Sequence, residues 1–313
     1  MMVARRILSI DGGGIKGMFP SAFLTAVERA LGRNIGDYFD LIVGTSTGGI
    51  IALALGAGFS ASEILRFYEE DGPKIFAGGT LRKLLRHIGY SKYDQRPLRE
   101  ALDRRFGTLK IQDARKRLVI PSFDLETGKV HVFKTRHHPR FEFDGNESMV
   151  EAALATTAAP SFFPTFRHAA GIPLVDGGVW ANNPVGVAAV EAIGVLGWNA
   201  EDLRILSLGC TSEPFNINLA RYRALGFIYW GINIRKIFSG GQTSAALGTA
   251  YLLAGRDRVV RIDPIVPPGR YSLDDVRAIE FLKGRGFSEA REWLPKLRPI
   301  FFEGPAEPFK LDG

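Results

Sequence analysis

The chain has 313 residues, of which 46% are hydrophobic and 23% charged, and its formal net charge is +7. This length can bury a complete core, and the composition is that of a globular protein, which excludes a disordered or fibrous chain. A single cysteine excludes an intramolecular disulfide framework, and no segment has the about 18 continuous apolar residues that a membrane-spanning helix needs. Because no apolar secretory signal follows the N-terminal charges, we expect a cytoplasmic protein that meets any membrane from outside.

The first predicted unit is a strand, a glycine-rich loop and a helix. Residues 6–11 form a short apolar strand that leads into the loop 12–17. Residues 19–31 then have the apolar spacing of a helix, and Gly32 is a typical stop signal after it. A loop of this kind presents successive backbone N–H groups at the start of a helix, where they can bind an anion.

The second unit contains a serine between two glycines. The apolar strand 41–43 ends at Gly44-Thr-Ser-Thr-Gly48, and a run rich in Ala, Leu and Ile follows as a buried helix. This is the G-x-S-x-G pattern, in which a nucleophilic serine occupies a strained turn and glycines two residues away let strand and helix approach each other. The pattern makes Ser46 the candidate nucleophile. On its own it is also compatible with an ordinary Gly/Ser/Thr-rich connection.

The remaining elements continue the alternation of helices and strands that is typical of an α/β fold. In chain order they are helices at 61–71 and 97–105, a hairpin of 117–124 with 129–135, a helix closed by a turn at 150–164, a strand at 174–176, a helix after Pro184, a strand at 203–208, an aromatic-rich helical segment at 215–253, a strand at 258–262 and a helix at 274–283 before a Pro-rich tail. We predict one domain over residues 1–313, with its motifs within about 5–190 and a helical C-terminal or lid portion at about 215–313.

A nucleophilic serine needs a base that takes its proton. None of the five histidines, His87, His131, His137, His138 and His168, follows a strand in a way that would bring it to Ser46. Asp176 is the better candidate, because it ends a strand as Ser46 does and Gly177 and Gly178 allow a sharp turn after it.

The developing oxyanion needs hydrogen-bond donors. The backbone N–H groups of Gly12, Gly13 and Gly14 are candidates, together with the N–H of Thr47, the residue after the nucleophile. These groups all follow strand ends, where an α/β sheet collects its active site. No Cys/His cluster suggests a metal, and Cys210 fits a small core residue better than a reactive thiol.

The loop also satisfies a competing pattern. Gly12-x-Gly14-x-x-Gly17 matches the dinucleotide-binding fingerprint, and an NAD(P)-binding protein is therefore the alternative function. That fingerprint requires an acidic residue at the end of the second strand, about 20 residues further on. Asp37 and Asp40 precede that strand instead, and nothing in this interpretation explains the G-x-S-x-G turn.

Two further features have two interpretations each. Residues 82–117 contain twelve Lys or Arg against four Asp or Glu, which could bind lipid headgroups or a phosphate ligand, or could be solvated helix surface. The aromatic residues of 215–253 could form a lid or a lipid-facing surface, or could pack against the main body. They are Tyr222, Phe227, Tyr229, Trp230 and Phe238.

Four motifs together resemble the patatin-like phospholipase family in order and spacing. They are Asp11-Gly-Gly-Gly-Ile-Lys-Gly17, Gly44-Thr-Ser-Thr-Gly48, Ala155-Thr-Thr-Ala-Ala-Pro160 and Asp176-Gly-Gly-Val-Trp-Ala-Asn-Asn-Pro184. The resemblance implies a three-layer α/β/α fold with a mostly parallel central sheet and a Ser-Asp dyad without histidine. By position it makes Ser46 the nucleophile, Asp176 the general base and the 12–14 turn the oxyanion hole. Lys16 stands where many members have Arg, so a two-pronged contact there is not expected.

The implied reaction is hydrolysis of fatty-acyl esters of membrane glycerophospholipids through an acyl-enzyme, with no metal or cofactor. An ordinary aspartate, with a pKa of about 3.9, is a weak base at neutral pH, so we expect desolvation to raise the pKa of Asp176. Glycines Gly44, Gly48, Gly177 and Gly178 and the cation of Lys16 would support the site.

The N-terminal half particularly resembles bacterial patatin-like phospholipases of antiviral defence, which degrade the inner membrane after a cyclic oligonucleotide binds. The resemblance implies a phospholipid membrane surface as substrate, a cyclic di- or trinucleotide as activator, no DNA or RNA polymer as partner, and a homo-oligomer on activation. It also implies that the active protein is peripheral to the inner membrane.

Overall fold

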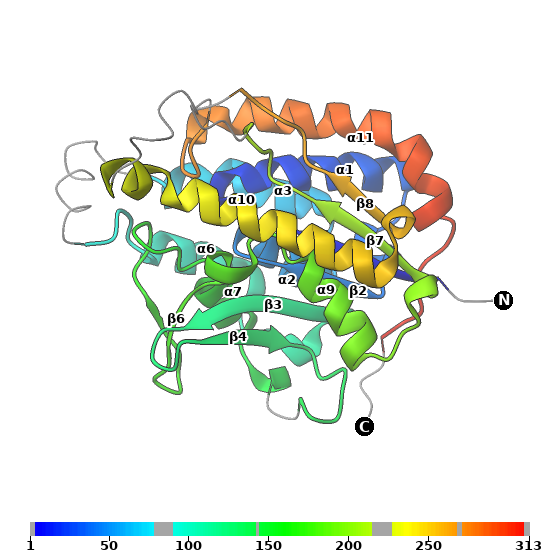
Figure 1. The fold of residues 1–313 in the computed structure, drawn as a ribbon, viewed down its shortest axis with the longest axis horizontal. Coiled ribbons are helices and arrows are strands. Elements are labelled where there is room, and N and C mark those ends of the chain that lie inside the picture. Colours follow the sequence, from blue (N-terminus) through cyan, green and yellow to red (C-terminus); the bar gives the residue numbers. More distant parts are fainter. Residues whose placement is uncertain (1–3, 78–89, 142–143, 215–226, 268–270, 310–313) are drawn as a thin grey trace.

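The computed structural model describes residues 4–77, 90–141, 144–214, 227–267 and 271–309. Within these residues one mixed, mostly parallel eight-stranded sheet lies between two layers of helices. Helices α1 (Met18–Leu31) and α11 (Ile279–Phe301) lie side by side on one side of the molecule, and α10 (Phe227–Ala254) crosses the other face (Figure 1). The predicted α/β/α architecture with a mostly parallel sheet is confirmed.

The sheet follows the order β5-β6-β3-β2-β1-β7-β8, and β4 pairs with β3 outside this path. Strands β1, β2, β7, β8 and the first part of β3 are parallel, whereas β4 and β6 pair antiparallel to β3 and β5 pairs antiparallel to β6. The bounds are β1 Arg5–Ile10, β2 Leu41–Gly44, β3 Arg117–Asp124, β4 Lys129–Lys134, β5 Phe166–Arg167, β6 Pro173–Asp176, β7 Leu203–Leu208 and β8 Val259–Ile262.

Side-chain alternation along the strands divides the core into two parts. On β2, Leu41 and Val43 belong to the cluster that packs under α9 and α10, whereas Ile42 belongs to the larger cluster under the opposite helices. Both faces of the central strands are therefore buried, as in a parallel sheet covered by helices on each side. Helix α2 (Thr47–Ala57) is buried along nearly its whole length, which explains its uniformly apolar sequence.

The pairing of β3 explains how two distant segments meet. β4 occupies one flank of β3, because Val119 and Ser122 both pair with it, at Lys134 and His131. On the other flank β2 pairs with the first part of β3 and β6 with the last part, in opposite directions. The carboxyl ends of β2 and β6 therefore point toward each other along the same flank.

The remaining helices lie close to their predicted positions, apart from the last helix and from the short helices α4 and α8, which were not predicted. Their bounds are α3 Ala61–Glu70, α4 Gly72–Ile75, α6 Arg96–Phe106, α7 Met149–Thr156, α8 Gly178–Ala181 and α9 Val185–Val190. The last helix was predicted at 274–283 with a Pro-rich tail, and this prediction is wrong, because α11 runs from Ile279 to Phe301 through Pro295 and Pro299. Each proline removes a helical N–H donor, but burial of Leu297 and packing along α1 hold the helix together.

Some of the predicted features fall outside the described residues. The basic run at 82–86 lies there, as does Tyr222, so the two interpretations of these features stay open. Within the described part, the basic residues Arg104 and Arg105 pair with Asp71. In that same part, no helix combines the length and the apolar character that crossing a membrane requires.

Two glycines of α11 test its packing against α1. A Cβ atom on Gly286 would lie 2.6 Å from the carbonyl oxygen of Phe19 and 2.7 Å from the Cβ of Ala22, whereas a Cβ on Gly284 meets no atom within 4 Å. We expect Gly286→Ala to lower the free energy of unfolding by about 1–3 kcal/mol through overpacking. The matched Gly284→Ala should be neutral or stabilising by up to about 1 kcal/mol, because alanine favours helix. Urea denaturation of both variants measures this, and equal effects would contradict the close contact.

Candidate active site

Ser46 occupies a strained turn between β2 and α2. Its backbone has φ 55° and ψ −123°, a conformation that residues other than glycine rarely adopt. The two flanking glycines make this turn possible. A Cβ on Gly44 would lie 2.1 Å from the carbonyl oxygen of Gly48, and a Cβ on Gly48 would lie 2.3 Å from the carbonyl oxygen of Ile10. The local geometry is therefore the strand–turn–helix arrangement that the G-x-S-x-G pattern predicts.

The hydroxyl of Ser46 donates a hydrogen bond to Asp176. The distance from Oγ to Oδ2 is 2.6 Å, and both residues are buried. The other carboxylate oxygen, Oδ1, accepts from the N–H of Gly178 at 2.6 Å. Gly177 allows the turn, since a Cβ there would lie 2.3 Å from the carbonyl oxygen of Pro121. The opposed strands β2 and β6 thus bring together two residues that are 130 positions apart.

Burial raises the pKa of Asp176 from its ordinary value to about 6. The hydrogen bonds from Ser46 and Gly178 lower the pKa, but by less than desolvation raises it. A carboxylate with this pKa is a stronger base than an exposed aspartate and remains ionised at neutral pH. The expected direction of the shift is therefore present in the structure.

A threonine that sequence reasoning did not single out fixes the serine turn. Thr156, at the end of α7, accepts the N–H of Ser46 at its Oγ1 (2.9 Å) and donates to the carbonyl oxygen of Pro121 (2.6 Å). Thr156 lies within the motif 155–160, and this was the only sequence feature that could have pointed to its role. Tyr68, on α3, had no such signal, although its hydroxyl contacts Thr47 Oγ1 at 2.5 Å and donates to the carbonyl oxygen of Thr47 at 3.0 Å.

The glycine loop offers fewer free donors than the sequence suggested. The N–H of Gly12 already donates to the carbonyl oxygen of Asn182 at 2.9 Å, which ties the loop to the segment after Asp176. The N–H groups of Gly13, Gly14 and Thr47 have no acceptor among the residues that the structure describes. All three residues line the same cavity as Ser46.

Lys16 makes a single backbone contact. Its Nζ donates to the carbonyl oxygen of Thr211 at 2.9 Å, and the residue lines the cavity. An ammonium group lacks the planar fork with which an arginine could hold two acceptors at once.

The dyad opens into a largely apolar cavity of about 940 Å³. Ser46, Asp176 and the glycine loop form its polar part. Its apolar walls include Ile50, Phe67, Ile75, Phe76, Leu98, Phe162, Phe163, Phe238, Leu247, Tyr271 and Leu273. Phe238, on α10, is 62% exposed and still contributes to this wall, so part of the aromatic-rich segment lies at the cavity. A cavity of this size and lining suits a long acyl chain with one polar group at the reacting end.

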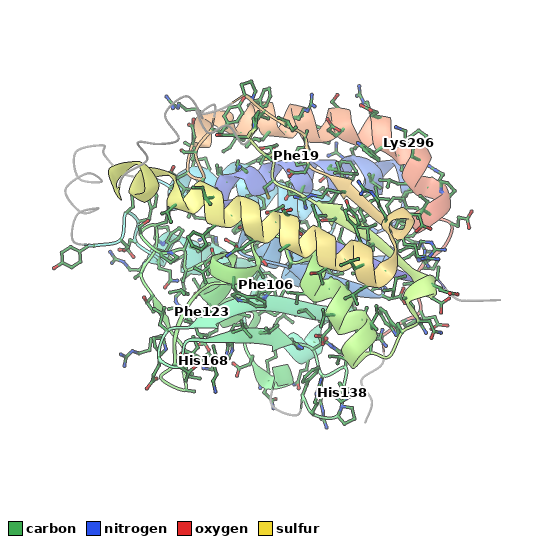
Figure 2. The ribbon with its side chains drawn as sticks, in the orientation of Figure 1. Phe19, Phe106, Phe123, His138, His168 and Lys296 are labelled. Carbon is green, nitrogen blue, oxygen red and sulfur yellow. The ribbon has the colours of Figure 1, made fainter. Side chains whose placement is uncertain are left out.

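None of the described histidines lines the cavity. His137 contacts Glu191 at 2.9 Å and Thr135 at 2.8 Å, and burial lowers its pKa. Figure 2 shows His138 and His168 on the β4 side of the sheet. His87 lies outside the described residues.

One group of side chains has the composition of a metal site. Glu147, Glu151 and His168 place ligand atoms within 4.8 Å of one another. The Nδ1 of His168 accepts the N–H of Ala170 at 3.2 Å, so the neutral ring carries its hydrogen on Nε2, which faces Glu147 Oε2 at 2.7 Å. This hydrogen bond uses the nitrogen that a metal would need.

Two other sequence interpretations can be compared with the structure. Asp40 precedes β2, and its carboxylate accepts the N–H of Arg6 at 2.8 Å. It therefore does not lie at the end of the second strand, where a ribose-binding acid is required. The structure therefore gives the dinucleotide interpretation no support. Cys210 is buried as expected, and burial raises the pKa of its thiol, which disfavours the reactive thiolate.

Known proteins are similar to this chain over most of its length. A sequence profile described as Patatin-like phospholipase matches residues 8–189. The chain is 33% identical to a protein of Escherichia coli named cGAMP-activated phospholipase, over 97% of this chain and 94% of that protein. A protein of the same name from Vibrio cholerae is also 33% identical, over 97% of this chain and 96% of the relative.

A solved structure agrees on the fold. VipD from Legionella pneumophila matches with a TM-score of 0.53 and 15% sequence identity, over 94% of this chain and 67% of VipD. At that identity the likeness concerns the fold alone.

Proposed function

This chain belongs to the patatin-like phospholipase family, and we propose that Ser46 and Asp176 carry out its reaction as nucleophile and general base. Family membership makes the chain a lipid ester hydrolase. The observation that carries the assignment of residues is the hydrogen bond of 2.6 Å from Ser46 Oγ to Asp176 Oδ2, at the polar end of an apolar cavity. The substrate is a membrane glycerophospholipid whose acyl chain occupies that cavity.

The reaction follows from the positions of these groups. Asp176 takes the proton of Ser46 as Oγ attacks the ester carbonyl carbon, and the N–H groups of Gly13, Gly14 and Thr47 hold the resulting oxyanion. The tetrahedral species then expels the lysophospholipid alkoxide, which receives the proton from Asp176 and leaves an acyl-enzyme on Ser46. A water molecule then gives its proton to Asp176 and attacks the acyl carbon. The bond from this carbon to Oγ breaks, Ser46 takes the proton back from Asp176, and the fatty acid leaves. Gly12 does not contact the oxyanion in this mechanism but anchors the loop, because its N–H is already bonded to the carbonyl oxygen of Asn182.

Substitutions at the dyad test these roles. Ser46→Ala should abolish fatty-acid release from liposomes, and Asp176→Asn should lower the rate by about 10²–10⁴-fold, since it keeps the shape but loses the base. A fluorophosphonate should label the wild-type protein and Cys210→Ala but not Ser46→Ala. Labelling that persists in Ser46→Ala would place the nucleophile elsewhere.

The pH profile tests the base. Because Asp176 accepts a proton only when ionised, and burial raises its pKa to about 6, kcat/KM should fall about tenfold per pH unit below pH 6 and be flat above it. Hydrolysis of a soluble ester from pH 4.5 to 8 measures this. A profile that stays flat down to the ordinary aspartate range would contradict the raised pKa of Asp176.

A second carboxyl needs a control in that experiment. Burial also raises the pKa of Asp11 to about 6, although Arg261 opposes the shift. The variant Asp11→Asn removes its titration and leaves that of Asp176, so the acid limb should persist in this variant.

The names of two relatives support the proposal that a cyclic nucleotide activates this enzyme. The Escherichia coli and Vibrio cholerae proteins are both named cGAMP-activated phospholipases, and each covers nearly the whole of this chain. We extend this to the present protein, with cGAMP or a related cyclic di- or trinucleotide as activator, homo-oligomer formation on activation, and action at the surface of the inner membrane. The uninterrupted pairing of β7 with β8 and the packing of α11 on α1 support a single domain over the whole chain.

Liposome hydrolysis with a nucleotide panel tests activation. We expect cGAMP or one other cyclic oligonucleotide to raise fatty-acid release at least about tenfold, with Ser46→Ala inactive throughout. Two salt concentrations show how far surface charge contributes, because salt screens exposed lysines and arginines. Sedimentation and liposome flotation of the same samples report oligomer formation and membrane binding. Equal hydrolysis with every nucleotide and with none would refute activation while leaving the hydrolase assignment intact.

A further inference from the structure

A buried ion pair lies directly before the glycine loop. Arg261, on β8, donates a hydrogen bond to each carboxylate oxygen of Asp11, from Nη1 to Oδ1 at 2.8 Å and from Nη2 to Oδ2 at 2.6 Å. The two side chains are only 13% and 6% exposed. A guanidinium that meets a carboxylate with two parallel hydrogen bonds fixes its orientation as well as its position.

The arginine is itself held in place. Its Nη1 also donates to Ser207 Oγ at 2.9 Å and its Nη2 to Asp263 Oδ2 at 2.9 Å. The close approach of Asp263 depends on Gly209, where a Cβ would lie 2.1 Å from Asp263 Oδ1. Strands β7 and β8 thus present one rigid cation to Asp11.

Asp11 stands between the two halves of the catalytic site. Its carbonyl oxygen would lie 2.7 Å from a Cβ on Gly48, so it touches the serine turn, and Gly12 follows it in the chain. Its N–H donates to the carbonyl oxygen of Leu208 at 3.0 Å, and its carbonyl oxygen accepts from Cys210 Sγ at 3.3 Å. Any shift of Asp11 would therefore move the N–H groups of Gly13 and Gly14 relative to Ser46.

We propose that Arg261 is a positioning residue of the oxyanion hole, which acts by fixing Asp11 at the root of the glycine loop. This inference rests on the proposed function, because it assigns the N–H groups of Gly13 and Gly14 to the oxyanion. The arginine lies beyond residues 8–189, which the family profile matches, so the C-terminal part of the chain completes the site.

The chemistry of the pair explains why arginine is needed. A carboxylate buried to this degree requires a partner, because an unpaired charge in the interior is costly. A lysine could supply the charge but only a single point of contact, so the loop could rotate about it. Oxyanion donors are effective only when they are aimed at the developing charge, and a misplacement of about 1 Å can cost about 10²-fold in rate.

The test compares Arg261→Lys with the matched control Arg258→Lys. Arg258 lies next to β8, and its Nη1 donates to the carbonyl oxygen of Ala254 at 3.0 Å and lies 3.9 Å from Asp257 Oδ1, so it contacts neither Asp11 nor the glycine loop through these bonds. Each variant is assayed with a soluble oxygen ester and with the thionoester of the same acyl chain and leaving group. Sulfur accepts hydrogen bonds weakly, so the ratio of the two kcat values reports the oxyanion hole and does not depend on how much of the protein is folded.

We expect Arg261→Lys to lower kcat for the oxygen ester about tenfold to a hundredfold with little change in KM, and to lower the ratio of oxygen-ester to thionoester rates. Asp11→Asn should lower the same ratio, and Arg258→Lys should leave it at the wild-type value. A ratio that stays at the wild-type value in Arg261→Lys, with or without a loss of rate, would overturn the proposal. All variants are assayed with and without the activating cyclic nucleotide. If the wild-type protein hydrolysed neither ester in either condition, the proposed function itself would fail, which is a different result.

Discussion

The site depends on two strands that run toward each other along one flank of β3. β2 runs parallel to β3 and ends at Gly44, whereas β6 runs antiparallel to β3 and ends at Asp176. The carboxyl ends of the two strands therefore meet. In an entirely parallel sheet these ends would lie side by side rather than face to face. The mixed sheet therefore creates the hydrogen bond from Ser46 to Asp176 and encloses it between buried strands and α2, where the low polarity raises the pKa of the aspartate.

Close packing of the backbone also helps to bring Ser46 and Asp176 together. Gly44, Gly48 and Gly177 are sites where a side chain would collide with a carbonyl oxygen, and each lies within two residues of Ser46 or Asp176. The strain at Ser46 is offset by the hydrogen bond from its N–H to Thr156 and by the burial of α2. Asp176 contacts Ser46 directly and is oriented by the N–H of Gly178, so the proposed dyad needs no histidine between the two residues.

The C-terminal part of the chain contributes to the same centre. Strand β8 extends the sheet beyond β7 and carries Arg261, while Leu273 accepts the N–H of Ile15 at 2.8 Å next to the glycine loop. Helix α10 adds Phe238 to the cavity wall. The four sequence motifs lie in the first 190 residues, but the lining of the cavity extends to Leu273 and the support of the loop includes Arg261.

The sequence by itself determined the elements whose signals are local: the strand and helix around Ser46, the hairpin of β3 and β4, the stop at Gly32, and the candidate pair Ser46 and Asp176. Tertiary structure decided what depends on distant contacts. It committed the N–H of Gly12 to Asn182, joined Arg261 to Asp11 across 250 positions, and carried α11 through two prolines by packing on α1. Propensity and spacing act within a few residues, whereas strand pairing and burial are set by the complete fold, so no local pattern could have revealed them.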